Sequence, residues 1–266
     1  MQTSRAFRSP SHRPGDPEDP GDPGDPGELL KPARVSGRAW PSERALVRIQ
    51  AGSGFVFALF LGLHLANTLL APLGPETYDG VQRWLRIAYQ QPFIEFGFVL
   101  APFLVHIASG VARARRRPKG KTGKKAKSVR WQRRAGWFLA VVVVMHTIAV
   151  RGPSLLYGVW LGFEGVAYSL QWVPGYFYPY YFIFGLAAAY HGGAGLVRVF
   201  RIFRIFVRRS SGFRHRSAVW RLVGRLLLFA YGLLLGLALL AFGGQIFAVE
   251  DPSTGDYARL IRGENL

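Results

Sequence analysis

The chain has 266 residues, of which 50% are hydrophobic and 14% aromatic, and its formal net charge is +19. It contains no cysteine, which excludes disulfides, Cys-ligated iron–sulfur clusters and covalently attached c-type haem within this chain. Twelve of the 34 Lys and Arg residues lie between Arg113 and Arg134, and nine more lie between Arg198 and Arg225. Both clusters adjoin apolar runs of about 20 residues, so the charge indicates the cytoplasmic ends of membrane helices rather than a nucleic-acid site.

The first segment of the chain, residues 1–43, includes the Pro, Gly and Asp repeat GDPEDPGDPGDPGE. This composition buries little apolar surface, so we predict a disordered cytoplasmic tail. No apolar stretch precedes the first hydrophobic segment, and we therefore expect no cleaved signal peptide. We predict a membrane domain over residues 44–249 and an outer C-terminal tail over residues 250–266.

The membrane domain contains five apolar segments, which predict an all-α, five-helix bundle in a bacterial cytoplasmic membrane. The predicted helices I to V are residues 52–73, 93–112, 131–150, 180–200 and 222–249. The connection 75–92 has the pattern of a short interfacial helix. The connection 151–179 is rich in Trp and Tyr, which is typical of a membrane interface.

The orientation follows from the two basic linkers, which should both be cytoplasmic. The N-terminus is then inside and, after five spans, the C-terminus is outside. The acidic residues between Ala45 and Val249 agree, since all four fall at the predicted outer face: Glu76, Asp79, Glu95 and Glu164.

Helices I–II and III–IV form an internal repeat. Helix I aligns with helix III without a gap, and the matched positions are Arg48 with Arg130, Gln50 with Gln132, Gly54 with Gly136, and His64 with His146. Helices II and IV both read His-x-x-x-Gly-x-x-Arg, beginning at His106 and His191. Each repeat is therefore a pair of helices with one histidine on each helix.

The depth of these histidines predicts how they pair. A rise of about 1.5 Å per residue places His64 and His146 about 18 to 22 Å from the cytoplasmic ends of their helices, beyond the midplane. His106 and His191 lie about 16 to 20 Å from the outer ends, on the cytoplasmic side of the midplane. Two ligands at equal depth suit the two faces of a planar macrocycle, so we predict two bis-histidine haems b stacked across the membrane.

Two other interpretations of the histidines remain open. A single histidine in a membrane helix can hydrogen-bond a neighbouring carbonyl or line a proton path, although intramembrane ionisable groups are usually functional. A metal or proton transporter built on a repeat is the main competitor. It would need carboxylates at mid-depth, and the predicted spans contain none there.

Small and polar residues on the ligand helices fit a large planar cofactor. The small residues that would allow a ring to approach the backbone are Ser53, Gly54, Gly110, Gly136, Gly192, Gly193 and Gly195. Helix–helix packing also uses such residues. Candidate donors to the propionates of the inner haem are Gln50, Ser53, Gln132, Arg113 and Arg198, although interfacial anchoring explains the arginines equally well.

These motifs resemble the di-haem, five-helix cytochrome b subunit of succinate:quinone oxidoreductases and quinol:fumarate reductases. The matching residues are R-x-Q-x-x-S-G (Arg48, Gln50, Ser53, Gly54) before His64 and Asn67, P-x-x-E (Pro92, Glu95) before His106 and Gly110, R-x-Q-x-x-A-G (Arg130, Gln132, Ala135, Gly136) before His146, and His191. The resemblance covers residues 45–245, including a fifth helix without a histidine. The chain departs from the family in its tail, in the basic linker after helix II and in the arginine-rich segment after helix IV.

The resemblance implies a respiratory membrane anchor for a flavoprotein subunit with covalent FAD and an iron–sulfur subunit. Succinate and fumarate chemistry would occur on the flavoprotein, and the anchor would exchange electrons with a quinone, usually menaquinone, near the outer haem. The resemblance places His106 and His191 on the haem near the iron–sulfur subunit, and His64 and His146 on the outer haem. It leaves open whether the complex forms a higher oligomer.

Quinol oxidation would also need a proton acceptor near the outer haem. Glu95, at the start of helix II, is the first candidate, and capping of the helix dipole is an equally good explanation for it. Weaker candidates on the same face are Glu76, Tyr78, Asp79 and Glu164. Two further classes remain open: a di-haem subunit of a quinone-linked formate dehydrogenase or hydrogenase, and a haem-free transporter or scaffold.

Overall fold

The computed structural model describes residues 41–116, 127–203 and 213–265, with side chains of the last segment described from residue 219 onward. The predicted disordered tail lies outside the described residues, except for its last three positions. Within that short stretch Ser42 caps the first helix, since its side chain accepts a hydrogen bond from the backbone N–H of Ala45 at 3.2 Å. Glu43 then opens the helix, where a carboxylate is favoured by the helix dipole.

Every regular element in the described part of the chain is helical. The long elements are α1 (Glu43–Thr68), α4 (Ala101–Arg115), α5 (Lys127–Tyr157), α7 (Pro174–Ile202) and α8 (Phe213–Phe242). The short ones are η2 (Ala71–Leu73), α2 (Pro75–Tyr89), α3 (Pro92–Ile94), the π-helical η3 (Glu95–Leu100), α6 (Phe163–Trp172), η4 (Pro252–Thr254) and α9 (Asp256–Ile261). The prediction of an interfacial helix over residues 75–92 matches α2.

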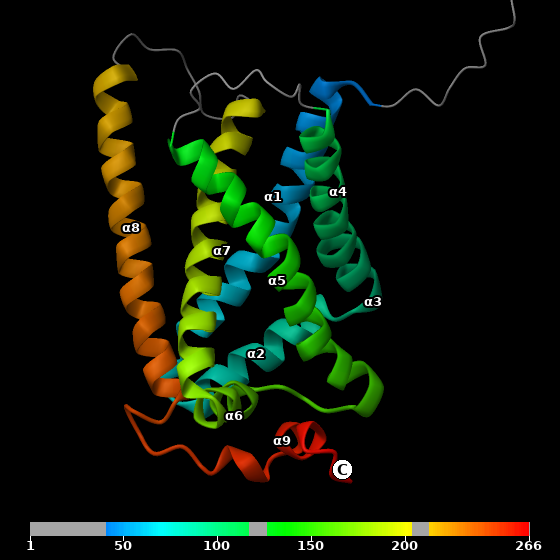
Figure 1. Ribbon diagram of the computed structural model, residues 1–266, viewed down its shortest axis with the longest axis vertical. Helices are drawn as coiled ribbons and strands as arrows, with labels where there is room; N and C mark the ends of the chain where they lie inside the picture. The colour runs from blue at the N-terminus through cyan, green and yellow to red at the C-terminus, as the bar shows by residue number, and fades with distance from the viewer. Residues whose placement is uncertain (1–40, 117–126, 204–212, 266) are drawn as a thin grey trace, which may run out of the picture. The chain divides into compact units, whose positions relative to one another are not determined.

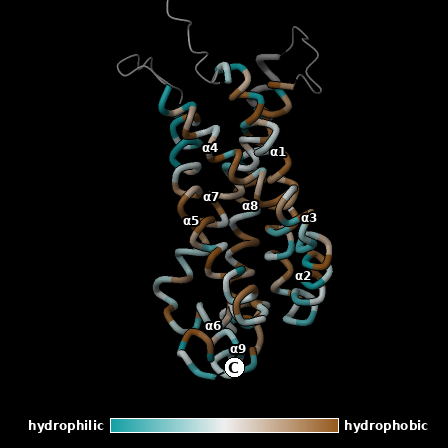
Figure 2. The backbone as a smooth tube through the Cα atoms, turned by 90° about the vertical axis from the view of Figure 1, so that its right-hand side faces the viewer, coloured by the Kyte–Doolittle hydropathy of each residue, from teal (hydrophilic) through white to brown (hydrophobic). Residues whose placement is uncertain are grey.

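Five helical segments are long and apolar enough to cross a membrane: Glu43–Leu73, Pro92–Arg115, Lys127–Tyr157, Pro174–Ile202 and Val219–Phe242. The prediction of an all-α multi-pass membrane protein with five spanning helices is confirmed at this level. Figure 2 shows that hydrophobic residues follow most of the length of these helices. Each spanning segment begins before its predicted start, but α1 and α8 end earlier than predicted, at Thr68 and Phe242 rather than at 73 and 249. The end of α8 is set by the glycines that follow it, of which Gly244 has a φ of 76°.

The second spanning segment is interrupted in a way that the sequence did not predict. Between α3 and α4 the chain forms the π-helical turn η3, in which the N–H of Ala101 donates to the carbonyl of Phe96. Pro102 follows directly, and proline lacks the N–H that an α-helix would use at that point while its ring crowds the carbonyl four residues earlier. A wider π turn accommodates both effects, and such turns are frequent at functional sites.

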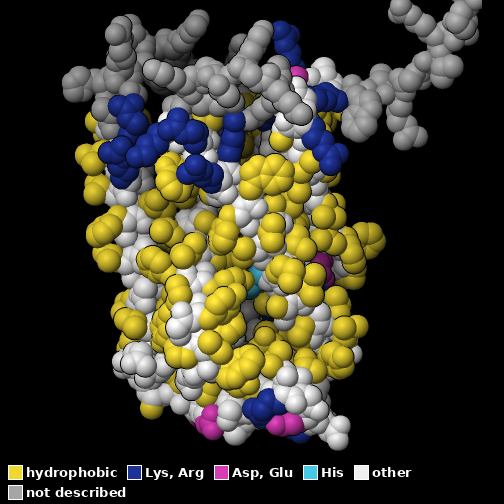
Figure 3. Space-filling view, viewed as in Figure 1, with side chains coloured by type: hydrophobic (Ala, Val, Ile, Leu, Met, Phe, Trp, Pro, Cys, Tyr) yellow, Lys and Arg dark blue, Asp and Glu magenta, His cyan; other side chains and the backbone are white. Residues whose placement is uncertain are grey.

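Figure 1 shows the arrangement of the long helices. α1 packs against α4 and α7, α5 packs against α7, and α8 packs against the other side of α7. Among the four histidine-bearing helices, α1 and α7 therefore form the centre, with α4 against α1 and α5 against α7, whereas α8 is peripheral. We call the end at which α1 begins the basic end, because most of the Lys and Arg side chains visible in Figure 3 gather there. The end formed by α2, α6 and α9 is called the capped end (Figure 1).

Most fully buried side chains lie at the capped end. The largest of them, Phe163 on α6 and Phe242 on α8, have ring centroids 4.6 Å apart, and Tyr78 of α2 packs edge-on against Phe242 at 5.0 Å. The C-terminal elements η4 and α9 pack against α6. Part of the predicted outer tail, residues 250–266, is therefore structured, since it contains η4 and α9.

Candidate functional site: two histidine pairs in a central cavity

The four predicted histidines lie on four different helices, and the structure brings them together in two pairs. The ring centroids of His64 (α1) and His146 (α5) are 6.2 Å apart, with an interplanar angle of 59°. Those of His106 (α4) and His191 (α7) are 6.1 Å apart, with an angle of 89°. These are the same pairs that depth along the helices predicted.

Both pairs line one cavity of about 1050 Å³ between the four helices. This volume is at the upper limit of the range of about 300–1,000 Å³ that is usual for ligand pockets. Most of the wall is apolar, and Figure 3 shows a histidine at the bottom of a hollow in a surface of hydrophobic side chains. The cavity thus combines an apolar environment with a few polar groups, as cofactor sites do.

The pair nearer the basic end is held by equivalent hydrogen bonds in the two halves of the chain. Nδ1 of His106 lies 2.9 Å from the backbone oxygen of Gln50, and Nδ1 of His191 lies 3.1 Å from that of Gln132. A carbonyl oxygen only accepts, so Nδ1 of each ring carries the proton and donates it. A neutral imidazole in this tautomer has its lone pair on Nε2, and metal-ligating histidines are usually oriented by a donation of this kind.

Two glycines make room for the same two rings. A Cβ atom at Gly54 would lie 2.5 Å from Nδ1 of His106, and one at Gly136 would lie 2.8 Å from Cε1 of His191. Any larger residue would force the ring to move. In contrast, a Cβ atom at Gly193 or Gly195 would meet nothing within 4 Å, so these glycines do not supply the close approach expected of them.

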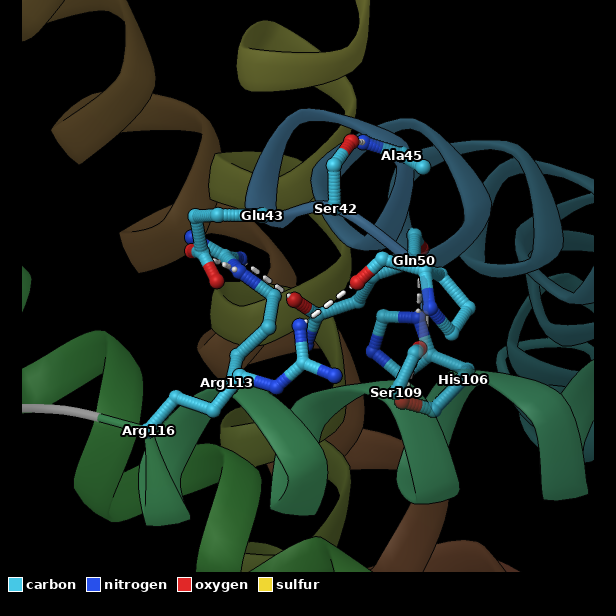
Figure 4. A network of polar contacts seen from close by, with 9 residues as sticks. Ser42, Glu43, Ala45, Gln50, His106, Ser109, Arg113 and Arg116 are labelled. Atoms are coloured by element: carbon cyan, nitrogen blue, oxygen red, sulfur yellow. Dashed lines mark hydrogen bonds and ion pairs between the residues drawn. The ribbon is translucent and has the colours of Figure 1, made fainter. Parts of the chain in front are cut away.

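A polar network supports this pair at the basic end (Figure 4). Arg113 donates from Nη1 to the side-chain oxygen of Gln50 at 2.6 Å and from Nε to Glu43 at 2.9 Å. Gln50 therefore holds His106 through its backbone and Arg113 through its side chain. Ser53 differs from the prediction, because its hydroxyl donates to the carbonyl of Ile49 in its own helix at 2.8 Å.

The corresponding glutamine of the second half is almost fully buried. Gln132 is 5% exposed and donates from Nε2 to the backbone oxygen of His191 at 2.9 Å. Its Oε1 has no hydrogen-bond partner within the described residues. Two other buried polar atoms on the cavity wall share this condition, Gln82 Oε1 and the Tyr231 hydroxyl. Orphaned buried polar atoms are uncommon in native proteins, so each of these three lining atoms is a candidate contact for a polar group of a ligand.

The pair nearer the capped end has aromatic neighbours. The His64 ring stacks on Phe60, with centroids 5.8 Å apart and an interplanar angle of 16°. The His146 ring meets Phe184 at 5.1 Å and 63°. Phe60 in turn packs edge-on against Tyr89 of α2 at 4.9 Å, and Tyr89 also lines the cavity, so α2 closes this side of it.

Glu95, the predicted proton acceptor, is engaged in a bidentate ion pair. Arg151 donates from Nε to one carboxylate oxygen at 2.6 Å and from Nη2 to the other at 2.7 Å, and both side chains are 22% exposed. Arg151 also donates to the hydroxyl of Ser154 at 3.0 Å, and Arg86 of α2 donates to the same hydroxyl at 3.2 Å. Glu95, Arg151, Ser154 and Arg86 all line the cavity. The sequence did not predict that Arg151, Ser154 and Arg86 line the cavity. The one sequence feature that singles out the two arginines is that the connections 75–92 and 151–179 contain few basic residues.

The weaker acidic candidates build the capped end. Asp79 accepts a hydrogen bond from the backbone N–H of Phe163 at 2.8 Å and so caps α6, whose own N-cap residue is Gly162. Glu164 packs so closely against Gly255 that a Cβ atom there would lie 1.0 Å from its Oε1. Burial raises the pKa of Asp79, and burial followed by the neighbouring carboxylates raises the pKa of Glu164. Neither residue lines the cavity.

The two remaining candidates differ in burial. Tyr78 is 5% exposed, belongs to the buried cluster of the capped end and lines the cavity. Burial raises the pKa of its hydroxyl. Glu76, in the first turn of α2, is exposed and does not line the cavity.

No group of three or more His, Cys, Asp or Glu side chains within the described ranges could hold a metal ion. A metal held entirely by protein ligands usually needs three or four of them. A haem iron needs at most two, because the macrocycle supplies the other four bonds. The arrangement of the histidines in twos therefore suits a haem better than a bare metal ion.

Comparisons of the chain with protein-family models, with curated proteins and with solved structures find no match. The function is accordingly inferred from the geometry of the two histidine pairs and from the residues around them.

Proposed function

We propose that the chain is the membrane-anchor cytochrome b subunit of a succinate:menaquinone oxidoreductase or quinol:fumarate reductase. In this proposal His64 and His146 hold one haem b, and His106 and His191 hold the other. The observation that carries it is the spacing within the pairs. A metal–imidazole bond of about 2.0–2.1 Å and about 1.1 Å from nitrogen to ring centroid give a centroid separation of about 6.2–6.4 Å across a metal ion. The observed separations are 6.2 and 6.1 Å.

Three further observations support the fit of a haem to this cavity. The Nδ1 donations to Gln50 and Gln132 leave Nε2 of His106 and His191 as the ligand atom. Gly54 and Gly136 let these rings lie against the neighbouring helix. The same contacts occur at aligned positions of both halves, which supports the proposed repeat of helices I–II and III–IV.

The residues around each pair would then have distinct tasks. At the basic end Gln50, Arg113, Gln132 and Arg198 line the cavity and offer N–H donors to the carboxylates of the inner haem, whereas the Ser53 hydroxyl is already used within its helix. At the other pair Phe60 and Phe184 fix the ring planes and exclude water. Two haems, when bound, supply one-electron carriers between the two faces of the membrane.

The orientation belongs to the same proposal. Lys and Arg side chains gather at the basic end (Figure 3), which supports a cytoplasmic position for that end and for the partner iron–sulfur subunit. The quinone would be handled near the capped end. Electrons that cross between the faces move charge through the membrane field, so turnover would couple to the membrane potential.

The proposed role of Glu95 in quinol oxidation depends on its contact with Arg151. Both of its carboxylate oxygens accept hydrogen bonds from Arg151, so the lone pairs that would take up a proton are already engaged. Proton acceptance at Glu95 would therefore require this contact to open, and quinol turnover should depend on Arg151 as well as on Glu95.

The proposal is tested by isolating the full chain, affinity-tagged, from its own membrane in mild detergent. We expect two soluble subunits to copurify, one with covalent FAD and one with iron–sulfur clusters, and the complex to reduce a menaquinone analogue with succinate. A partner containing molybdenum or nickel would instead assign the chain to a formate dehydrogenase or hydrogenase. A chain that copurifies with no redox subunit would contradict both assignments.

A further inference from the structure

The basic residues of the two outer connections converge on one place at the surface of the capped end. The connections 75–92 and 151–179 contain three Lys or Arg residues in all: Arg83, Arg86 and Arg151. The guanidinium carbons of Arg83 and Arg86 lie 5.2 and 5.7 Å from the centroid of the same Trp160 ring. Arg86 and Arg151 both donate to the hydroxyl of Ser154. Three positively charged side chains are thus gathered around only two neighbouring side chains, Trp160 and Ser154.

The nearby carboxylates do not balance these charges. Glu95 is committed to Arg151 through both of its oxygens, and Asp79, which interacts electrostatically with Arg83, also accepts the N–H of Phe163. Three guanidinium groups therefore face two carboxylates, and the excess charge falls on Arg86. Burial lowers the pKa of Arg86; Tyr89 and Glu95 raise it and the charge of Arg151 lowers it, in smaller measure than burial. An anion at this place would relieve the repulsion.

A depression of about 270 Å³ lies at this cluster, and its lining residues are Arg83, Arg86, Ile87, Gln90 and Trp160. Arg86 donates from Nε to the side-chain oxygen of Gln90 at 3.0 Å, which orients the guanidinium plane. Only two of its five N–H groups are used by Gln90 and Ser154 within the described residues. The depression has the size and the donors for one oxyanion group of the phosphate class.

We propose that this depression binds the phosphate of an anionic phospholipid headgroup in the outer leaflet. The neighbouring apolar side chains favour a lipid over free phosphate. On the same helix, α2, Trp84 is 75% exposed and Ile87 is 56% exposed, so apolar groups adjoin the two arginines. A helix with basic residues beside exposed Trp and Ile is typical of the membrane interface, where a headgroup and the start of its acyl chains are both within reach.

The site is tested on the purified full chain, stripped of lipid in detergent and then given dioleoylphosphatidylglycerol, dioleoylphosphatidylcholine or inorganic phosphate. Native mass spectrometry counts the retained lipid, and thermal unfolding reports stabilisation. We expect phosphatidylglycerol to be retained and to raise Tm more than phosphatidylcholine does. The R83Q/R86Q variant should bind phosphatidylglycerol about 30-fold more weakly, from the contribution of two arginines near the membrane surface.

The matched control is R259Q/R262Q, which removes two arginines with the same spacing, one on α9 and one directly after it. It should retain phosphatidylglycerol like the wild type. R83K/R86K keeps the charge without the planar guanidinium and should bind with intermediate strength, which provides a second variant if R83Q/R86Q does not fold. If inorganic phosphate but not phosphatidylglycerol raises Tm, and R83Q/R86Q loses this effect, the depression binds soluble phosphate and the assignment to a lipid is wrong. Equal retention of phosphatidylglycerol by R83Q/R86Q and R259Q/R262Q would overturn the proposal.

Discussion

Replacing Gly54 by alanine should displace the His106 ring and weaken the pair it forms with His191. The added Cβ would lie 2.5 Å from Nδ1 and 2.7 Å from Cε1 of His106, which is too close for any side-chain atom. The ring must rotate or retreat, and either movement disrupts the donation from Nδ1 to the Gln50 carbonyl at 2.9 Å.

The magnitude follows from three contributions. Overpacking costs about 1–3 kcal/mol, and the lost hydrogen bond costs about 1 kcal/mol. Alanine in place of glycine inside a helix returns up to about 1 kcal/mol. The net loss in free energy of unfolding is therefore about 1–3 kcal/mol, and about 2 kcal/mol corresponds to a decrease in Tm of about 4–8 °C.

The assay is thermal unfolding of the purified chain in detergent, together with the absorption of the haem that we propose for the His106/His191 pair. Gly62→Ala is the matched control, because Gly62 lies on the same helix and a Cβ atom there would meet nothing within 4 Å. Gly62→Ala should gain stability from helix propensity, and Gly136→Ala should behave like Gly54→Ala. If Gly54→Ala is as stable as Gly62→Ala and its spectrum is unchanged, the inferred contact with His106 is wrong.

Three further predictions concern the capped end. Arg151→Gln should destabilise the protein by about 1–3 kcal/mol because it leaves the partly buried Glu95 carboxylate without its partner. Glu95→Gln in the same chain should recover part of this loss in a double-mutant cycle of unfolding free energies. The pKa of Glu164 is raised in the folded state. Its contribution to stability is therefore full below the ordinary carboxyl pKa and is lost as pH rises through the raised value. Between about pH 4 and pH 8, Tm should fall with pH less steeply in Glu164→Gln than in the control Glu76→Gln. Gly255→Ala places a Cβ atom in the space of the exposed Glu164 carboxylate, which can turn away. Hydrogen exchange over η4 and α9 should therefore stay as in the wild type, and faster exchange over these elements would refute this.

The helices and the histidine pairs could be predicted because they depend on local information. Apolar length marks the spanning helices, and the rise per residue places each histidine at a depth within its own helix. The helices that carry His64 and His146 begin on the same side, as do the two that carry His106 and His191. Equal depth along the helices was therefore enough to predict the pairs. The contacts of the rings with the backbone of Gln50 and Gln132 were not predicted, because they join residues 56 and 59 positions apart on different helices.

The features that escaped prediction depend on contacts between distant segments. Glu95 and Arg151 are 56 positions apart, and Asp79 and Phe163 are 84 positions apart. Neither contact has a periodic signal, because each joins the first residue of one helical element to the interior of another. The π-helical turn at residues 95–100 also escaped, since Pro102 marks a disruption in the sequence without showing how the backbone absorbs it.

The central claim is that each histidine pair holds one haem b. It is tested most directly by counting haem per polypeptide, from dithionite-reduced minus oxidised spectra, in the wild type and in the four single variants His64→Ala, His146→Ala, His106→Ala and His191→Ala. The account predicts two haems b in the wild type, with the same haem lost from His64→Ala and His146→Ala and the other lost from His106→Ala and His191→Ala. A folded wild-type chain that binds no haem would contradict it and would favour a haem-free transporter or scaffold.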